Sequence, residues 1–83
     1  MPVPALSDRD AAILSFEASW PRHSGAKEEA IRAQLGITPA RFYQLLGRII
    51  DTESALAHDP LLVGRLRRIR DARLAAQAAR FIA

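Results

Sequence analysis

The sequence predicts an all-α protein in which four helices form a single domain. Large apolar residues recur at spacings of three and four, and no stretch shows the alternation of a strand. Ser, Thr and Asp stand where the periodic stretches begin, and such residues cap helices. A length of 83 residues suits one domain with one core. We expect the domain to span residues 1–83 and its core to span about residues 6–70.

The first helix is predicted over residues 8–19. Ser7 is a favourable N-cap, and Asp10 at the third helical position forms a pattern like a capping box with it. Its apolar face carries Ile13, Phe16 and Trp20. Pro21 ends the helix because proline cannot continue the backbone hydrogen bonding.

The second and third helices are predicted on either side of a short turn. The second runs from about Ala26 to Leu35, and Gly36 supplies the left-handed residue that stops it. Thr38 caps the third helix and Pro39 takes its first position. The strongest periodic pattern in the chain follows, in Phe42, Leu45, Leu46 and Ile49.

The fourth helix is predicted to begin at Pro60, with Asp59 as its N-cap. The segment before it, residues 51–59, reads as a polar connection with room for a short helical turn. Leu62, Leu66 and Ile69 share one face of the helix, but Arg73, Ala76 and Arg80 continue that face. We therefore expect residues 71–83 to project from the core or to fray. The alanine-rich end is the candidate element for a homodimer, through Ala72, Ala75, Ala76, Ala78 and Ala79.

The charge is distributed unevenly along the chain. Residues 1–59 hold six Lys or Arg against eight Asp or Glu, whereas residues 60–83 hold six Arg against Asp71. A basic end on a nearly neutral body favours a polyanionic partner. We expect the arginines of the fourth helix to hold DNA phosphates, with Arg65, Arg67, Arg68 and Arg70 as the candidates. A solvated helix face and an acidic protein partner remain as alternatives.

The sequence lacks the residues that metal sites, common enzyme sites and membrane spans require. There is no cysteine, and His23 and His58 stand without ligand spacing, so we expect no metal and no cofactor. The glutamates have no neighbouring His at a useful spacing, which argues against an enzyme. No segment reaches the roughly 20 apolar residues of a membrane span, and the first residues do not resemble a signal peptide. We expect a cytoplasmic, nucleoid-associated protein.

The third helix should present a distinct face opposite its apolar side. Successive residues turn by about 100°, which places short side chains on that face with arginines and a tyrosine beside them. The predicted DNA-contacting set on this helix is Thr38, Ala40, Arg41, Tyr43, Gln44, Gly47 and Arg48. Gln44 can pair with adenine, and the arginines can reach guanine or phosphate. Gly47 costs roughly 1 kcal/mol relative to Ala inside a helix, which indicates close approach either to DNA or to a neighbouring helix.

The segment from Lys27 to Ile49 resembles the helix-turn-helix of bacterial repressors and of the promoter-binding domain of sigma factors. The resemblance rests on Gly36 between Leu35 and Ile37, with Phe42 six residues after the glycine. Such motifs usually have a small residue four positions before the glycine, where this chain has Arg32. The helices are therefore expected to cross at a wider angle, or Arg32 to extend outward.

The whole chain is similar to a family of short actinobacterial proteins of unknown function with a predicted helix-turn-helix. The segments that carry this resemblance are LSDRDAAILSFEASW, GAKEEAIRAQLGITPARFYQLL and ALAHDPLLVGRLRRIRDAR. It implies a single-domain, DNA-associated protein, and our first hypothesis is a transcriptional regulator on double-stranded DNA. The alternative is a helical adaptor that docks its basic helix on an acidic partner, such as a protein of the transcription machinery.

Overall fold

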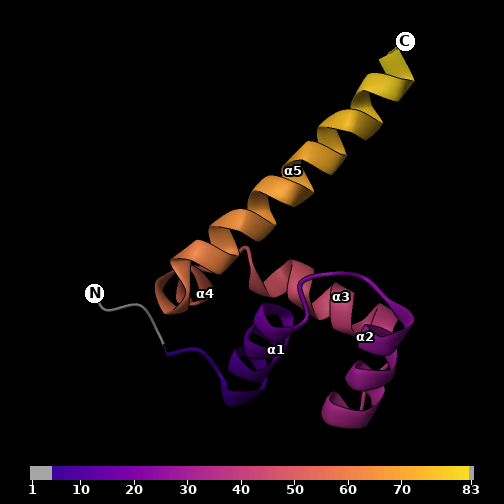
Figure 1. Ribbon diagram of the computed structural model, residues 1–83. Helices are drawn as coiled ribbons and strands as arrows, with labels where there is room; N and C mark the ends of the chain where they lie inside the picture. The colour runs from indigo at the N-terminus through magenta and orange to yellow at the C-terminus, as the bar shows by residue number, and fades with distance from the viewer. Residues whose placement is uncertain (1–4, 83) are drawn as a thin grey trace.

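The computed structural model describes residues 5–82, except the side chain of Ile82, and within them it contains helices and no strand. The elements are α1 (Asp8–Ser19), α2 (Gly25–Ala30), η1 (Ile31–Leu35), α3 (Pro39–Ile49), α4 (Glu53–His58) and α5 (Pro60–Ile82) (Figure 1). The all-α prediction is confirmed. The count of four helices is wrong, because α4 is a helix of its own. Our expectations for residues 1–4 and 83 lie outside the described residues.

Each helix that follows a loop begins at a side-chain cap, which explains why the boundaries were readable from the sequence. An oxygen of the capping residue accepts a hydrogen bond from the backbone N–H three residues later, at 3.0–3.2 Å. The capping residues are Ser7, Ser24, Thr38, Thr52 and Asp59. Three of these caps, at the first, third and last helices, are the ones that the sequence predicts.

The short helix α4 exists because the predicted polar connection carries both a cap and an anchor. The Thr52 hydroxyl accepts from the N–H of Ala55 and donates to the carbonyl of Ile49 at 2.7 Å, so one side chain ends α3 and starts α4. Ala55 is fully buried. One small apolar residue therefore docks a helix whose other residues are mostly polar or exposed.

The turn before α3 explains the unexpected Arg32. Residues 31–35 form a π-helical turn, which holds more residues per turn than an α-helix, and Gly36 ends it at φ 68°. Ile31 is fully buried, and Arg32 is exposed and pairs with Glu29 at 3.3 Å. The wider turn thus puts Ile31 toward the core and lets Arg32 extend outward, which is one of the two arrangements expected.

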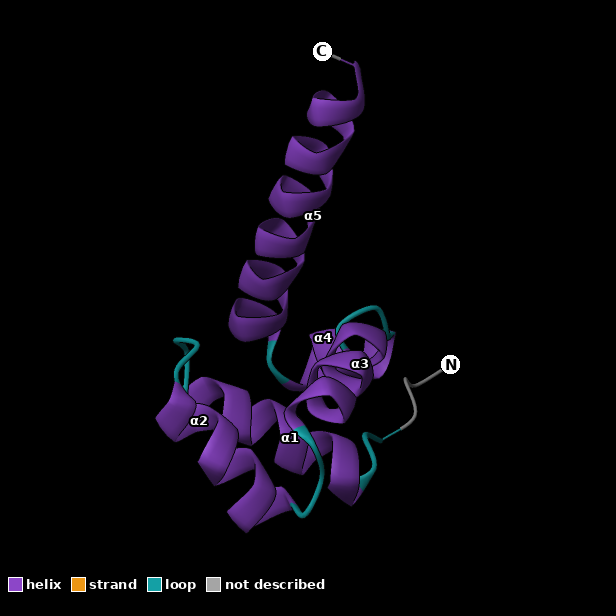
Figure 2. Ribbon diagram, turned by 90° about the vertical axis from the view of Figure 1, so that its right-hand side faces the viewer, coloured by secondary structure: helices purple, strands orange, loops and turns teal. Residues whose placement is uncertain are grey.

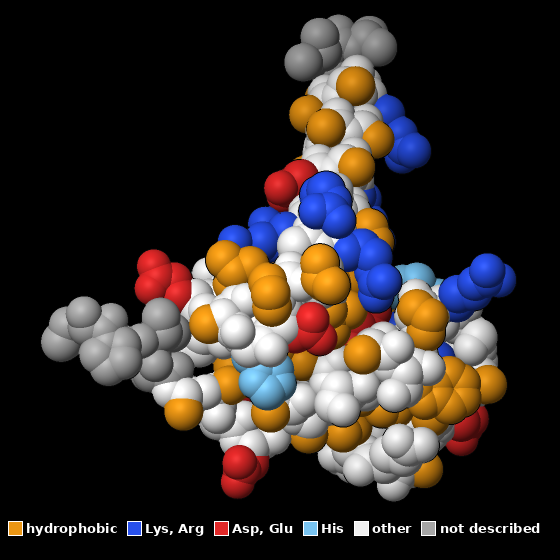
Figure 3. Space-filling model, turned by 60° about the vertical axis from the view of Figure 1, so that its left-hand side comes forward, with side chains coloured by type: hydrophobic (Ala, Val, Ile, Leu, Met, Phe, Trp, Pro, Cys, Tyr) orange, Lys and Arg blue, Asp and Glu red, His pale blue; other side chains and the backbone are white. Residues whose placement is uncertain are grey.

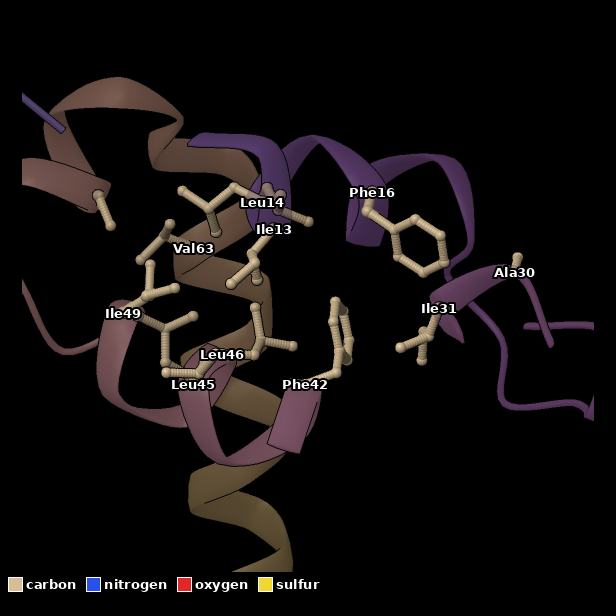
Figure 4. Packing of buried hydrophobic residues seen from close by; sticks show 13 residues of the cluster. Ile13, Leu14, Phe16, Ala30, Ile31, Phe42, Leu45, Leu46, Ile49 and Val63 are labelled. Atoms are coloured by element: carbon tan, nitrogen blue, oxygen red, sulfur yellow. The ribbon is translucent and has the colours of Figure 1, made fainter. Parts of the chain in front are cut away.

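The core lies between α1 and α3 and is closed by η1 and the start of α5. The rings of Phe16 and Phe42 pack edge to face with centroids 5.3 Å apart (Figure 4). All four apolar residues predicted for α3 are buried. Leu62 and Val63 fix the first turn of α5 against this core.

The helix α5 continues far beyond the body of the protein. It is 23 residues long, and residues 71–81 are all exposed. Figures 1 and 2 show its second half extending away from the other helices. The side chain of Ile69 is already 49% exposed, so the apolar face of α5 leaves the core before residue 71. The segment remains helical through Ile82.

Candidate nucleic-acid interface

The outer face of α3 consists of four exposed residues opposite the core: Ala40, Arg41, Gln44 and Arg48. The side beneath them is fixed by the buried apolar residues of the same helix. The helix contains two arginines and no carboxylate, and its sequence is PARFYQLLGRI. This face is therefore a rigid, positively charged surface with one short side chain near its start.

Two residues of the outer face are hydrogen-bonded to each other. The Arg41 Nη1 donates to Oε1 of Gln44 at 2.7 Å. This bond orients the Gln44 amide and leaves its NH₂ group as a free donor. A carbonyl oxygen accepts two hydrogen bonds, so Gln44 can keep Arg41 and still bind an adenine edge.

Thr38 acts first as the cap of α3. Its Oγ1 accepts from the N–H of Arg41 at 3.1 Å, and the residue is exposed. The cap fixes the direction in which α3 starts and thereby the position of Arg41. Its hydroxyl hydrogen can still be donated to a phosphate, as the sequence prediction requires.

Tyr43 and Gly47 lie on a different side of α3, where they line an open groove of about 460 Å³. We call this the α3–α5 groove. The Tyr43 hydroxyl is 2.8 Å from Nδ1 of His23, and its ring lies 5.2 Å from Nζ of Lys27. Tyr43 is thus held by its neighbours at the edge of the groove.

Gly47 is not required by packing within the chain. A Cβ built on Gly47 meets nothing within 4 Å among the described residues. Of the two explanations offered by the sequence, close approach to a neighbouring helix is therefore wrong. The glycine leaves open space on the groove side of α3.

The arginines of α5 fall into groups with different surroundings. The side chain of Arg67 donates to the carbonyls of Ile50 and Thr52, across the end of α3. Arg70 pairs with Asp51 and with Asp71. The hydrogen bond to Asp51, and then the one to Asp71, raises the pKa of the Arg70 guanidinium above its usual value. Both predicted phosphate ligands therefore already have partners inside the chain.

The other arginines of this helix have no carboxylate partner among the described residues. Arg65 and Arg73 line the α3–α5 groove, and Figure 3 shows basic side chains gathered where α5 leaves the body. Arg68 is exposed on the side of α5 opposite its buried residues, as the helical repeat requires. Arg65 shares a surface with α3, whereas Arg68 faces away from it.

A buried ion pair beside the groove was missed by the sequence reasoning. The Lys27 Nζ donates to Glu17 Oε1 at 2.6 Å, and the two side chains are 1% and 7% exposed. The sequence did indicate that Glu17 is buried, because it follows Ile13 by one turn on the apolar face of α1. The lysine partner could not be found, because it lies in another helix.

Comparisons with known proteins identify the family of the chain. A family model described as a protein of unknown function, DUF3263, matches residues 5–78. The chain belongs to this family. No curated protein and no solved structure matches the chain significantly. The DUF3263 family confirms the expected kinship to a family of unknown function and brings no chemistry with it, so the helix-turn-helix and its ligand stay predictions.

The described residues of this DUF3263 protein hold neither a metal-binding cluster nor a membrane-spanning helix. Within residues 5–82, no three His, Asp or Glu side chains gather as ligands of one metal ion. None of the helices described is both long enough and apolar enough to cross a membrane.

Proposed function

We propose that this protein binds double-stranded DNA and regulates transcription in the nucleoid, with α3 lying in the major groove. The observation that carries the proposal is the outer face of α3: exposed, free of carboxylates and fixed from below by the core. A rigid helix with basic and amide side chains on one face is the usual reader of the major groove.

The arrangement around this face supports a helix-turn-helix. The α2–η1 helix ends at Gly36, two further residues follow, and α3 begins at Pro39. In proteins with this motif the second helix lies in the groove and its first residues contact bases. Here those first residues include Ala40 and Gln44, so a short side chain allows the amide to come near the base edges.

Different roles follow for the residues of the outer face. Gln44 pairs with adenine, while Arg48 and Arg41 contact guanine or phosphate. A good bidentate pair contributes roughly 1–3 kcal/mol of discrimination between bases. The net charge of +3 attracts the duplex.

One copy of this domain forms only a small interface with DNA, and useful sequence specificity requires a second DNA-binding unit. The projecting half of α5 could supply it by pairing with a second copy, because Leu74 and Phe81 are 54% and 92% exposed there. A two-fold dimer would then bind two half-sites.

The proposal is tested by a mobility-shift titration with random duplexes at about 50 and 200 mM salt. Neutralising about four phosphates would make the affinity fall roughly 100-fold over this range. Arg48→Ala should weaken binding to every duplex and lower the salt dependence. Absence of binding at the lower salt would contradict the proposal.

A further inference from the structure

The α3–α5 groove has a chemistry that differs from that of the outer face of α3. Its apolar lining consists of Leu46 of α3, Ile50 directly after that helix, Leu66 and Ile69 of α5, and Pro21 from the loop before α2. Ile69 is 49% exposed and lines the groove beside Leu66. Apolar surface in a concave place is the usual mark of a binding site rather than of a solvated face.

Gly47 is the second, independent observation that points to an occupant. It stands in the interior of α3, where glycine weakens a helix relative to alanine. No atom of the described chain comes within 4 Å of a Cβ placed there. The fold therefore gains nothing from the missing side chain, whereas a molecule lying in the groove gains close access to the α3 backbone.

The charges around the groove select the kind of occupant. Arg65 and Arg73 line it eight residues apart, which is about 12 Å along α5. Arg70 is already paired with two aspartates. Glu17, the carboxylate that lines the groove within the described residues, is buried and bonded to Lys27. The groove thus offers two positive charges that follow each other along α5, with the apolar Leu66 and Ile69 between them in the sequence.

We propose that the α3–α5 groove binds an acidic amphipathic helix of a partner protein. The apolar face of such a helix lies on the floor, one of its large side chains fills the space at Gly47, and two carboxylates about two turns apart meet Arg65 and Arg73. A DNA strand fits worse, because the apolar floor would remove water from phosphates without replacing it. The α5 helix of a second copy fits worse as well, because it carries six arginines and one aspartate.

The partner site and the proposed DNA site lie on different sides of α3. Gln44 and Arg48 belong to the outer face, and Gly47 belongs to the groove. The inference does not depend on DNA binding and stands if the duplex experiment fails. Where both hold, the protein joins a duplex and a second protein on one helix.

The test is an NMR titration of the ¹⁵N-labelled full chain with a synthetic helical peptide. One face of the probe peptide carries Leu residues at spacings of one and two helical turns. Two Glu residues, seven positions apart, flank this face. The amide signals of three glycines report on different places, because Gly47 lines the groove, Gly36 lies in the turn before α3 and Gly25 begins α2. We expect Gly47 to shift in a saturable way and Gly25 and Gly36 to stay in place.

Matched variants identify the groove as the place of binding. Gly47→Leu adds a side chain into open space, so it should fold and yet weaken peptide binding at least tenfold. Arg65→Glu should weaken binding to a similar extent, whereas Arg68→Glu on the far side of α5 should leave it within twofold. A peptide with Lys in place of each Glu should not bind.

Three results would overturn the inference. The first is the absence of a saturable Gly47 shift with the acidic peptide up to about 1 mM. The second is a Gly47 shift that follows protein concentration without peptide, together with a dimer in sedimentation, because a second copy would then occupy the groove. The third is a duplex that shifts Gly47 and displaces the peptide.

Discussion

The Glu17–Lys27 pair joins α1 to α2 at the edge of the candidate interface. Both side chains are almost completely buried, and Nζ of the lysine also lies 5.7 Å from the ring centroid of Phe42. Two buried charges stabilise a fold little in net terms, because removing them from water costs about as much as their attraction returns. Leaving one of them alone is far more costly.

Lys27→Met should lower the free energy of unfolding by about 3–5 kcal/mol, because it leaves the Glu17 carboxylate buried without a partner. Urea denaturation followed by circular dichroism measures the change. The double variant Glu17→Leu with Lys27→Met should recover most of the loss. Equal destabilisation of the single and double variants would show that packing, not charge, explains the effect.

Gly47→Ala should raise the free energy of unfolding by about 0.5–1 kcal/mol, because alanine favours a helix and its Cβ meets no neighbour. Thermal denaturation of the variant beside the native chain measures it. A destabilised variant would mean that a close contact within the fold requires the glycine.

At the residue scale, helix caps could be predicted from the sequence, whereas side-chain partners on other helices could not. Ser7, Thr38 and Asp59 cap helices as predicted, because a cap bonds a backbone group three residues away. The partners of Glu17 and Arg67 lie on other helices. Sequence spacing does not contain that information, so the ion pair was missed and Arg67 was taken only for a phosphate ligand.

The connection between α3 and α5 is held by an arginine of the longer helix. Arg67 donates to the carbonyls of Ile50, the C-cap of α3, and of Thr52, the N-cap of α4. The carbonyl of Ile50 lies where the helix offers no partner, whereas that of Thr52 also accepts from the N–H of Leu56. The contact joins α5 to the junction between α3 and α4.

Arg67→Ala should lower the free energy of unfolding by about 1–3 kcal/mol, because hydrogen bonds from a charged group to carbonyls are lost. Arg68→Ala is the matched control on the same helix, and it should stay within about 0.5 kcal/mol of the native chain. Chemical denaturation of the two variants gives the comparison. If both change stability alike, the contact of Arg67 does not stabilise the fold.

At the scale of the elements, a helix could be predicted from the sequence where apolar residues recur at helical spacing, and was missed where they do not. The large apolar residues Phe42, Leu45, Leu46 and Ile49 of α3 repeat over about two turns, and all four are buried. In α4 only Ala55 is buried, and one small residue gives no periodic signal. The π-helical turn at η1 also lacks a sequence signal. Arg32 therefore appeared to depart from the helix-turn-helix pattern, although the wider turn accommodates this side chain.

The molecule as a whole consists of a compact helical body and a projecting helical rod (Figures 1 and 2). The charge asymmetry of the sequence does not mark this division, because four of the six arginines of α5 lie at residues 65–70 and residues 71–82 hold Arg73 and Arg80 against Asp71. The α3–α5 groove could not be predicted, since it depends on how two helices cross. The outer face of α3 was therefore predicted from the sequence, whereas the α3–α5 groove was found only in the structure.

Removal of residues 73–83 should change the free energy of unfolding by less than about 1 kcal/mol, because the exposed end of α5 buries little. Thermal and urea denaturation of the shortened chain measure this. The shortened chain loses two arginines, Arg73 and Arg80, so any DNA binding should weaken and depend less on salt. Unfolding of the shortened chain would show that the rod supports the body.

Sequence selection from a random duplex pool tests the central claim most directly, with the native chain beside Gln44→Ala and Arg68→Ala. If α3 reads bases, the native chain enriches a defined pattern that contains an adenine position. Gln44→Ala should then lose the preference at that position alone, while Arg68→Ala keeps the whole pattern. An unenriched pool, or the same pattern from all three proteins, would contradict the assignment of the outer face of α3 as the DNA-reading surface.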